Sequence, residues 1–100
     1  FYFGEFNDVP LAPFSISLAT IKQAGYVAEK KHYHTKHQKV YVTLAGEGVL
    51  NVDGKDIVMR SEEMIQVEPN EVHFVQSVTS DSLSFIVVLG AKENDKVVVD

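Results

Sequence analysis

Hydrophobic and polar residues alternate with a period of two along most of this chain. Such alternation is typical of β-strands, because successive side chains of a strand point to opposite faces, whereas a helix requires apolar residues at i, i+3 and i+4. The pattern predicts nine short strands and an all-β protein. The predicted strands span residues 14–23, 26–34, 40–45, 48–52, 56–59, 64–67, 73–78, 83–89 and 96–99.

Turn-forming residues separate the predicted strands at Gly46-Glu47-Gly48, Asp53-Gly54, Pro69-Asn70 and Ser80-Asp81-Ser82, among other places. Asp53-Gly54 is the most specific of these signals. A type I′ hairpin turn needs a positive φ at both central residues, and Asp-Gly adopts that conformation readily. Many short strands with regular turns and no helix between them are typical of a sandwich, a jelly roll or a small barrel.

The first fourteen residues differ from the rest because they contain five of the ten aromatic residues, together with Pro10 and Pro13. We therefore expect residues 1–14 to form an N-terminal arm. Residues 15–100 are expected to form a single domain, since about 100 residues is a typical domain size. The arm either covers one open end of its own barrel or adds a strand to a partner subunit.

Composition and charge narrow the classes of function. The net charge is −5, from 9 basic and 14 acidic residues, and this charge disfavours nucleic acid as a partner. The absence of an apolar run of about 18 residues indicates no membrane span. Since the chain has no cysteine, disulfides, thiolate metal ligands and cysteine nucleophiles are excluded, and a cytoplasmic location is expected.

Three of the four histidines, His32, His34 and His37, lie within six residues, and the fourth is His73. His32 and His34 are two residues apart in a predicted strand, so they point to the same face about 6.6 Å apart. Two imidazoles in this arrangement can converge on one metal ion. The alternative is an exposed strand edge that carries two polar residues.

Residues 25–46 resemble the first cupin motif, G(X)5HXH(X)3,4E(X)6G. His32 and His34 match its histidines, while Lys39 stands at the position of the family's glutamate. Residues 62–77 are similar in spacing to the second motif, G(X)5PXG(X)2H(X)3N, with His73 at the position of its histidine. The two motifs and the fifteen residues between them cover about half of the chain.

The resemblance implies a double-stranded β-helix, the jelly-roll barrel of the cupins. It also implies that His32, His34 and His73 converge inside the barrel as ligands of a divalent transition metal. The resemblance leaves open whether this metal is Fe, Zn, Mn, Ni or Cu, and whether the site holds a metal at all. A protonated lysine offers no lone pair to a metal, so Lys39 does not replace the missing glutamate. The remaining candidates for a fourth ligand are Gln38, His37, Glu71 and water.

Four of the nine basic residues, Lys30, Lys31, Lys36 and Lys39, lie within ten residues. This cluster either attracts an anionic small molecule toward the histidines or forms a rim that discourages pairing between sheet edges. Tyr41 lies two residues after Lys39, on the same face of its strand, and is a candidate proton donor.

Three functions are compatible with these residues. The first is a metal-dependent cupin that binds a small oxygen-rich or anionic molecule, or acts on it as a dioxygenase or as an isomerase of a sugar or keto acid. The second is a metal-free isomerase or epimerase in which a histidine is the base, Tyr41 the acid and Lys39 the group that binds the anion. The third is a non-catalytic module that binds or senses a small ligand. The family resemblance and the arm also predict a homodimer.

Overall fold

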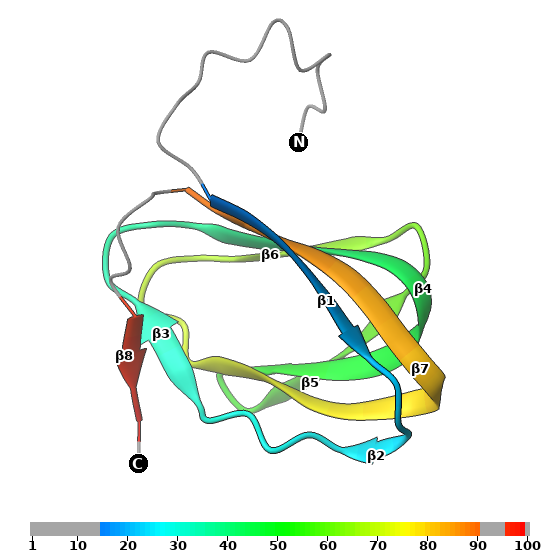
Figure 1. Cartoon of the computed structure of the whole chain (residues 1–100). Helices are drawn as coiled ribbons and strands as arrows, with labels where there is room; N and C mark the ends of the chain where they lie inside the picture. The colour runs from blue at the N-terminus through cyan, green and yellow to red at the C-terminus, as the bar shows by residue number, and fades with distance from the viewer. Residues whose placement is uncertain (1–14, 91–95, 100) are drawn as a thin grey trace, which may run out of the picture.

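The computed structural model describes residues 15–90 and 96–99, and the predicted arm, residues 1–14, lies outside the described residues. The described part of the chain forms strands and no helix, which confirms the predicted all-β class (Figure 1). It accordingly contains no helix long and apolar enough to cross a membrane. The strands are β1 (Ser15–Ile21), β2 (Gly25–Tyr26), β3 (His32–His34), β4 (Lys39–Val52), β5 (Lys55–Arg60), β6 (Met64–Val67), β7 (His73–Leu89) and β8 (Lys96–Val98).

The two longest strands, β4 and β7, are antiparallel partners, and both bend near the middle (Figure 1). The register between them shifts at three places from Thr43 to Leu50. Such bulges turn a strand and increase its twist, so one strand can contribute to two sheets. Turns were predicted at residues 46–48 and 80–82, with separate strands on either side of each. The division into separate strands was wrong, because both segments bend a strand that continues beyond them.

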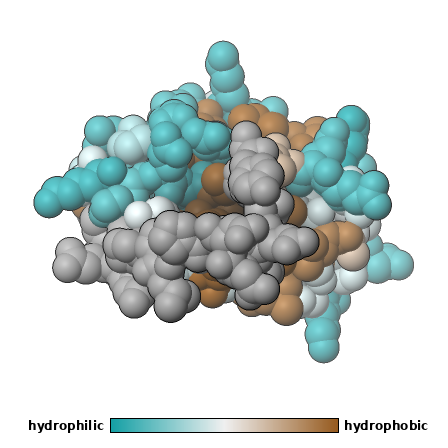
Figure 2. All heavy atoms as spheres, turned by 90° about the horizontal axis from the view of Figure 1, so that it is seen from above, coloured by the Kyte–Doolittle hydropathy of each residue, from teal (hydrophilic) through white to brown (hydrophobic). Residues whose placement is uncertain are grey.

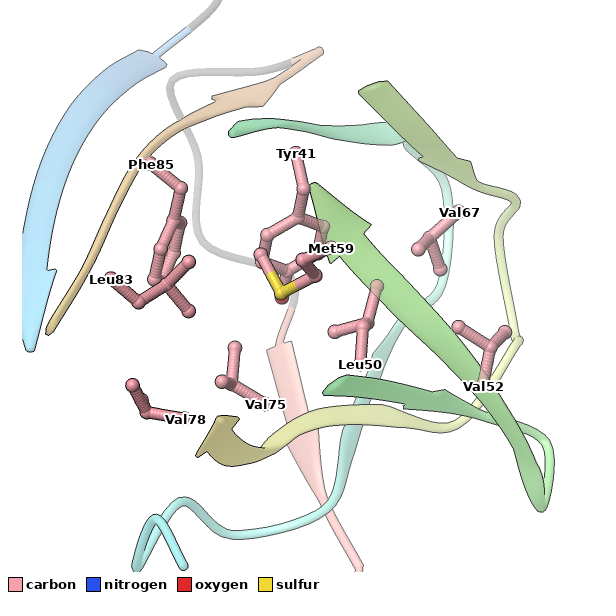
Figure 3. Packing of buried hydrophobic residues seen from close by; sticks show 9 residues of the cluster. All are labelled: Tyr41, Leu50, Val52, Met59, Val67, Val75, Val78, Leu83 and Phe85. Carbon is pink, nitrogen blue, oxygen red and sulfur yellow. The ribbon is translucent and has the colours of Figure 1, made fainter. Parts of the chain in front are cut away.

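The bends divide the fold into two facing layers (Figure 1). In one layer, β1 and β6 flank the first half of β4 and the second half of β7. In the other, β5 pairs with the second half of β4, while β2 and β3 pair with the first half of β7 and β8 pairs with β3. The buried hydrophobic side chains lie between the layers, as expected for a jelly roll (Figure 3). They are Tyr41, Leu50, Val52, Met59, Val67, Val75, Val78, Leu83 and Phe85.

The predicted Asp53-Gly54 hairpin joins β4 to β5. Both residues have positive φ, 49° for Asp53 and 85° for Gly54, as a type I′ turn requires. Asp53 also exchanges two hydrogen bonds with Val72: its backbone N–H donates to the carbonyl of Val72 at 2.7 Å, and its carboxylate accepts from the N–H of Val72 at 2.8 Å. The hairpin therefore holds the segment that leads directly into His73.

Gly46→Ala is expected to destabilise the fold, because the bends of β4 and β7 touch at this residue. Gly46 has a φ of +82°, and a Cβ atom there would overlap the backbone oxygen of Ser82. We expect the free energy of unfolding, measured by urea denaturation, to fall by about 3 kcal/mol or more.

The matched control is Gly54→Ala, since Gly54 has a similar φ of +85° and no atom lies within 4 Å of the added Cβ. Its expected loss in the free energy of unfolding is about 1–2 kcal/mol, from the positive φ alone. Equal losses for the two variants would contradict the close approach of the two bends.

Candidate functional site

His32, His34 and His73 meet at one end of the barrel. His32 and His34 both point inward from β3, and His73 begins β7 directly opposite His32 in the register. The three side chains are buried, with exposed fractions of 2%, 5% and 1%. One ring nitrogen from each lies within 4.8 Å of the other two. The structure thus brings together the three histidines of the two motifs in an arrangement that can hold a metal ion.

Backbone carbonyl groups orient two of these rings. Nδ1 of His32 donates a hydrogen bond of 2.9 Å to the carbonyl of Lys30, and Nδ1 of His73 donates one of 2.8 Å to the carbonyl of Glu71. Because a carbonyl oxygen only accepts, Nδ1 carries the proton in both rings. In the neutral ring, Nε2 then keeps its lone pair. Each ring therefore presents an acceptor to the other residues of the site.

Lys39 extends its side chain from the start of β4 to the histidines. Its Nζ lies 3.0 Å from Nε2 of His32 and 3.3 Å from Nε2 of His73. It also lies 4.9 Å from the centroid of the Tyr41 ring. An ammonium group has three N–H donors and no acceptor, so Lys39 donates to the lone pairs of the two imidazoles. The residue at the position of the family's glutamate is thus bonded to the histidines themselves.

Burial sets the charge states in the site. Loss of hydration lowers the pKa of His32 to about 4 and that of His73 to about 3, and the charge of Lys39 adds to both shifts. Both rings are therefore neutral at pH 7. Burial also lowers the pKa of Lys39 to about 8, so its amine is mostly protonated at pH 7. Burial raises the pKa of Tyr41, which keeps its hydroxyl protonated.

Glu29 also acts on the charges of this site, although it was not predicted from the sequence. It lies in the connection between β2 and β3. Its Oε1 accepts a hydrogen bond of 3.0 Å from the backbone N–H of Val75 in β7. Its negative charge raises the pKa of both Lys39 and Tyr41. No sequence motif predicts this role. The position of Glu29 depends on its own carboxylate, which accepts the hydrogen bond of a β7 backbone N–H where a backbone carbonyl would otherwise do so.

The other predicted site residues lie around the cluster in different ways. Gln38 is exposed and donates to the carboxylate of Glu68 at 3.3 Å. The carboxylate of Glu71 accepts from the backbone N–H of Glu68 at 2.7 Å, so the side chain closes the turn before β7. The backbone carbonyl of Glu71, rather than its carboxylate, contacts His73. Tyr41 is buried, with its ring centroid 6.1 Å from that of His73.

The three histidines fit a divalent transition metal, whereas the charged Lys39 does not. Neutral imidazole is a ligand that Fe, Zn, Ni, Cu and Mn accept. An ion about 2.1 Å from Nε2 of His32 would lie within roughly 5.1 Å of Nζ of Lys39, since that nitrogen and Nζ are 3.0 Å apart. The repulsion between a divalent ion and the ammonium at this distance is about 6 kcal/mol at an effective dielectric constant of 20.

Comparison with known proteins decides the family. Residues 18–89 match the family model of the cupin domain. The chain belongs to the cupin family. Within this cupin, the histidines of both motifs are present, while the glutamate of the first motif is replaced by Lys39 and the second motif is matched in spacing and at His73 alone.

One curated relative is the oxalate-binding protein of Thermotoga maritima. It is 28% identical to this cupin over 58 residues, which cover 58% of the cupin and 48% of the relative. The match therefore spans about half of the length of that relative.

Several solved structures share the fold. A Klebsiella pneumoniae protein with a double-stranded β-helix domain has a TM-score of 0.74 and 12% identity, covering 93% of this cupin and 80% of that chain. The nucleoside dehydratase Pac13 has a TM-score of 0.70 and 14% identity, covering 92% and 72%. An oxalate oxidase in complex with glycolate has a TM-score of 0.69 and 16% identity, covering 84% and 45%. These similarities confirm the double-stranded β-helix expected from the motifs.

Acid is expected to destabilise this cupin through His32 and His73. Their pKa values are lower in the folded protein than the ordinary 6.5, so the unfolded chain binds more protons from about pH 6.5 down to pH 4. Stability is therefore retained above pH 6.5 and lost as the pH falls through this window. We expect the free energy of unfolding in urea to decrease by about 2 kcal/mol or more between pH 7 and pH 5.

The control for this prediction is His73→Asn, which removes one titrating ring and keeps an N–H donor for the carbonyl of Glu71. Between pH 7 and pH 5, the free energy of unfolding of this variant should decrease clearly less than that of the wild type. A decrease of the same size in both proteins would contradict the assignment to these rings.

Proposed function

We propose that this cupin binds a small carboxylate or a similar oxyanion at the cluster formed by His32, His34, His73 and Lys39. The observation that carries the proposal is the partly buried ammonium of Lys39, which is held by two neutral imidazoles. Because these rings carry no negative charge, they orient the ammonium without neutralising it. A bound anion would supply the negative charge beside the ammonium.

The charges around the cluster support an anionic ligand. Three charged side chains shift the pKa values of groups in the site. Two are cations, Lys39 and Lys96, and one is a carboxylate, Glu29. Among the described residues that act on these groups, cations therefore outnumber carboxylates. Lys30, Lys31 and Lys36 are exposed in the same stretch of chain and add to the attraction of an anion from solution.

The chemistry of the ligand follows from the donors available. Lys39 uses two of its three N–H donors on the histidines, and the third is left for a ligand with oxygen acceptors. The names of two similar proteins agree with this chemistry, since one is an oxalate-binding protein and the other an oxalate oxidase in complex with glycolate. Oxalate and glycolate are therefore suitable first probes.

Acid–base catalysis is a second candidate function, and the 3.0 Å contact between Lys39 and His32 favours it. In an isomerisation of a keto acid or sugar, the ammonium of Lys39 would turn from Nε2 of His32 to the carbonyl oxygen of the substrate. The lone pair released on Nε2 would then remove a proton from the carbon beside the carbonyl group. The ammonium of Lys39 would return a proton to the carbonyl oxygen, giving an enol. Where a hydroxyl group stands on that carbon, the product is an enediol. The histidinium would then give its proton to the former carbonyl carbon, and the amine of Lys39 would take the proton of the other hydroxyl oxygen, so that the carbonyl group moves by one carbon. Tyr41, as a neutral hydroxyl, is an additional proton donor. Metal-dependent dioxygenation and a cytoplasmic location stay predictions.

Binding of oxalate and glycolate is expected to depend on Lys39. In isothermal titration calorimetry at pH 7 with EDTA present, the wild type should bind at least one of them with one site per chain. Lys39→Met should weaken binding about tenfold or more, because a charged hydrogen bond is lost. Lys22→Met, the same change at an exposed lysine after β1, should have no effect. Equal affinities for the wild type and Lys39→Met would contradict the proposal.

The homodimer expected from the resemblance also stays a prediction, and the outer face of one sheet supports it. In the register, Leu18 lies opposite Ile86, Ile86 opposite Val42, and Val42 opposite Met64, so an apolar row crosses four strands. Leu18 is 68% exposed and Met64 is 43% exposed. Figure 2, a view from above, shows hydrophobic atoms open to solvent among hydrophilic ones. Exposed apolar rows of this kind are typical of subunit interfaces.

Light scattering is therefore expected to give the mass of a dimer for the wild type and of a monomer for Leu18→Glu. The control is Thr20→Glu, which places the same charge on the same exposed face of β1, two residues further along the strand. A monomeric wild type at concentrations of tens of micromolar would contradict the prediction.

A further inference from the structure

We infer that Lys39 takes the place of the metal ion in this cupin, so that two of the three clustered histidines hold an ammonium group of the protein itself. The inference starts from the contacts of Nζ, at 3.0 Å from Nε2 of His32 and 3.3 Å from Nε2 of His73. His32 and His73 also belong, with His34, to the group of side chains whose ring nitrogens lie close enough to share a metal ion. The Nε2 lone pairs of His32 and His73 are already used by Lys39.

The backbone holds Lys39 where its side chain reaches the histidines. Lys39 is the first residue of β4 and is paired on both sides, with Val67 of β6 and with Leu89 of β7. Rotation of its side chain is therefore the means by which Nζ would leave the cluster. The ring of Tyr41 lies 4.9 Å from Nζ and favours a cation at this place.

The charges of the site are rearranged to suit an ammonium. In the family motif, a glutamate at the position of Lys39 contributes negative charge beside the histidines. Here that position is a cation, and the carboxylate that acts on it comes from Glu29, in the connection between β2 and β3. The carboxylate of Glu71 is bonded to the backbone of Glu68 instead of to the cluster. The charge of Glu29 offsets only part of the effect of burial and of Lys96 on Lys39, and a divalent ion in addition would increase the excess of positive charge.

The inference predicts that residue 39 determines whether the histidines bind metal. Metal-free wild type, Lys39→Glu and Lys39→Met would each be titrated with Zn²⁺ and Ni²⁺ in the absence of oxalate. Competition with a chelating dye would give the affinities, and elemental analysis after desalting would give the stoichiometry. We expect well under one ion per chain for the wild type. Lys39→Glu should hold one ion per chain, with an affinity at least about 100-fold higher.

Two controls separate the cluster from other effects. Lys22→Glu makes the same change of charge at an exposed lysine after β1, and it should bind metal as weakly as the wild type. In His73→Ala/Lys39→Glu, the gain in affinity should disappear, since one of the three imidazoles is removed. Circular dichroism checks that each variant is folded. If Lys39→Glu does not fold, Lys39→Met decides, because it removes the charge and keeps an unbranched side chain.

The results that would overturn the inference are distinct from those that would overturn carboxylate binding. A wild type that holds one ion per chain as tightly as Lys39→Glu would refute the replacement of the metal by Lys39, whatever its affinity for oxalate. Folded Lys39→Glu and Lys39→Met proteins that both fail to bind metal would refute it as well, because Lys39 would then not be what excludes the ion. Carboxylate binding is measured separately in EDTA, where metal has no part.

Discussion

The fold depends on the bend in the paired strands β4 and β7. Lys39 and His73 lie at opposite ends of this ladder, since Lys39 pairs with Leu89 and His73 pairs with Val52. Thirteen residue steps along a straight strand would separate the two ends by about 43 Å. In the folded chain, Nζ of Lys39 lies 3.3 Å from Nε2 of His73. The bend near Gly46, where backbone approaches backbone, therefore brings the halves of the site together.

A cation inside such a barrel requires both hydrogen-bond acceptors and compensating charge. Neutral imidazoles provide acceptors at Nε2, because the proton of each ring is on Nδ1, which donates to the carbonyl group of Lys30 or Glu71. They provide no charge, so Glu29 is the carboxylate that favours the charged form of Lys39. Burial of an incompletely compensated ammonium opposes folding, and a site of this kind is retained for what it binds or does.

Local sequence signals predicted the parts of the structure that depend on neighbouring residues. Alternation predicted the all-β class, Asp53-Gly54 predicted its hairpin, and the spacing of His32 and His34 placed them on one face. The link from those residues to His73 came from the family motifs, since no local spacing relates residues forty positions apart.

Other features could not be predicted because they depend on residues distant in the sequence. Gly46-Glu47-Gly48 is compatible with both a turn and a bend, and pairing with β7 selects the bend. The contact of Lys39 with two imidazoles depends on the folding of one sheet over the other. The same holds for the place of Glu29 beside β7. Lys39 was recognised as a departure from the motif, but whether it points outward or into the cluster is decided by its pairing at the start of β4.

The sign of one charge determines which chemistry the histidine cluster supports by itself. A carboxylate at residue 39 adds a ligand and negative charge to three neutral imidazoles, and both favour a divalent ion. An ammonium at the same residue donates hydrogen bonds to those imidazoles and presents a single positive charge with a proton that can be transferred. With Lys39 in contact with His32, the residues of this chain offer a base and an acid side by side. The chemistry that they supply together is the stabilisation of an oxyanion and the movement of a proton to or from it.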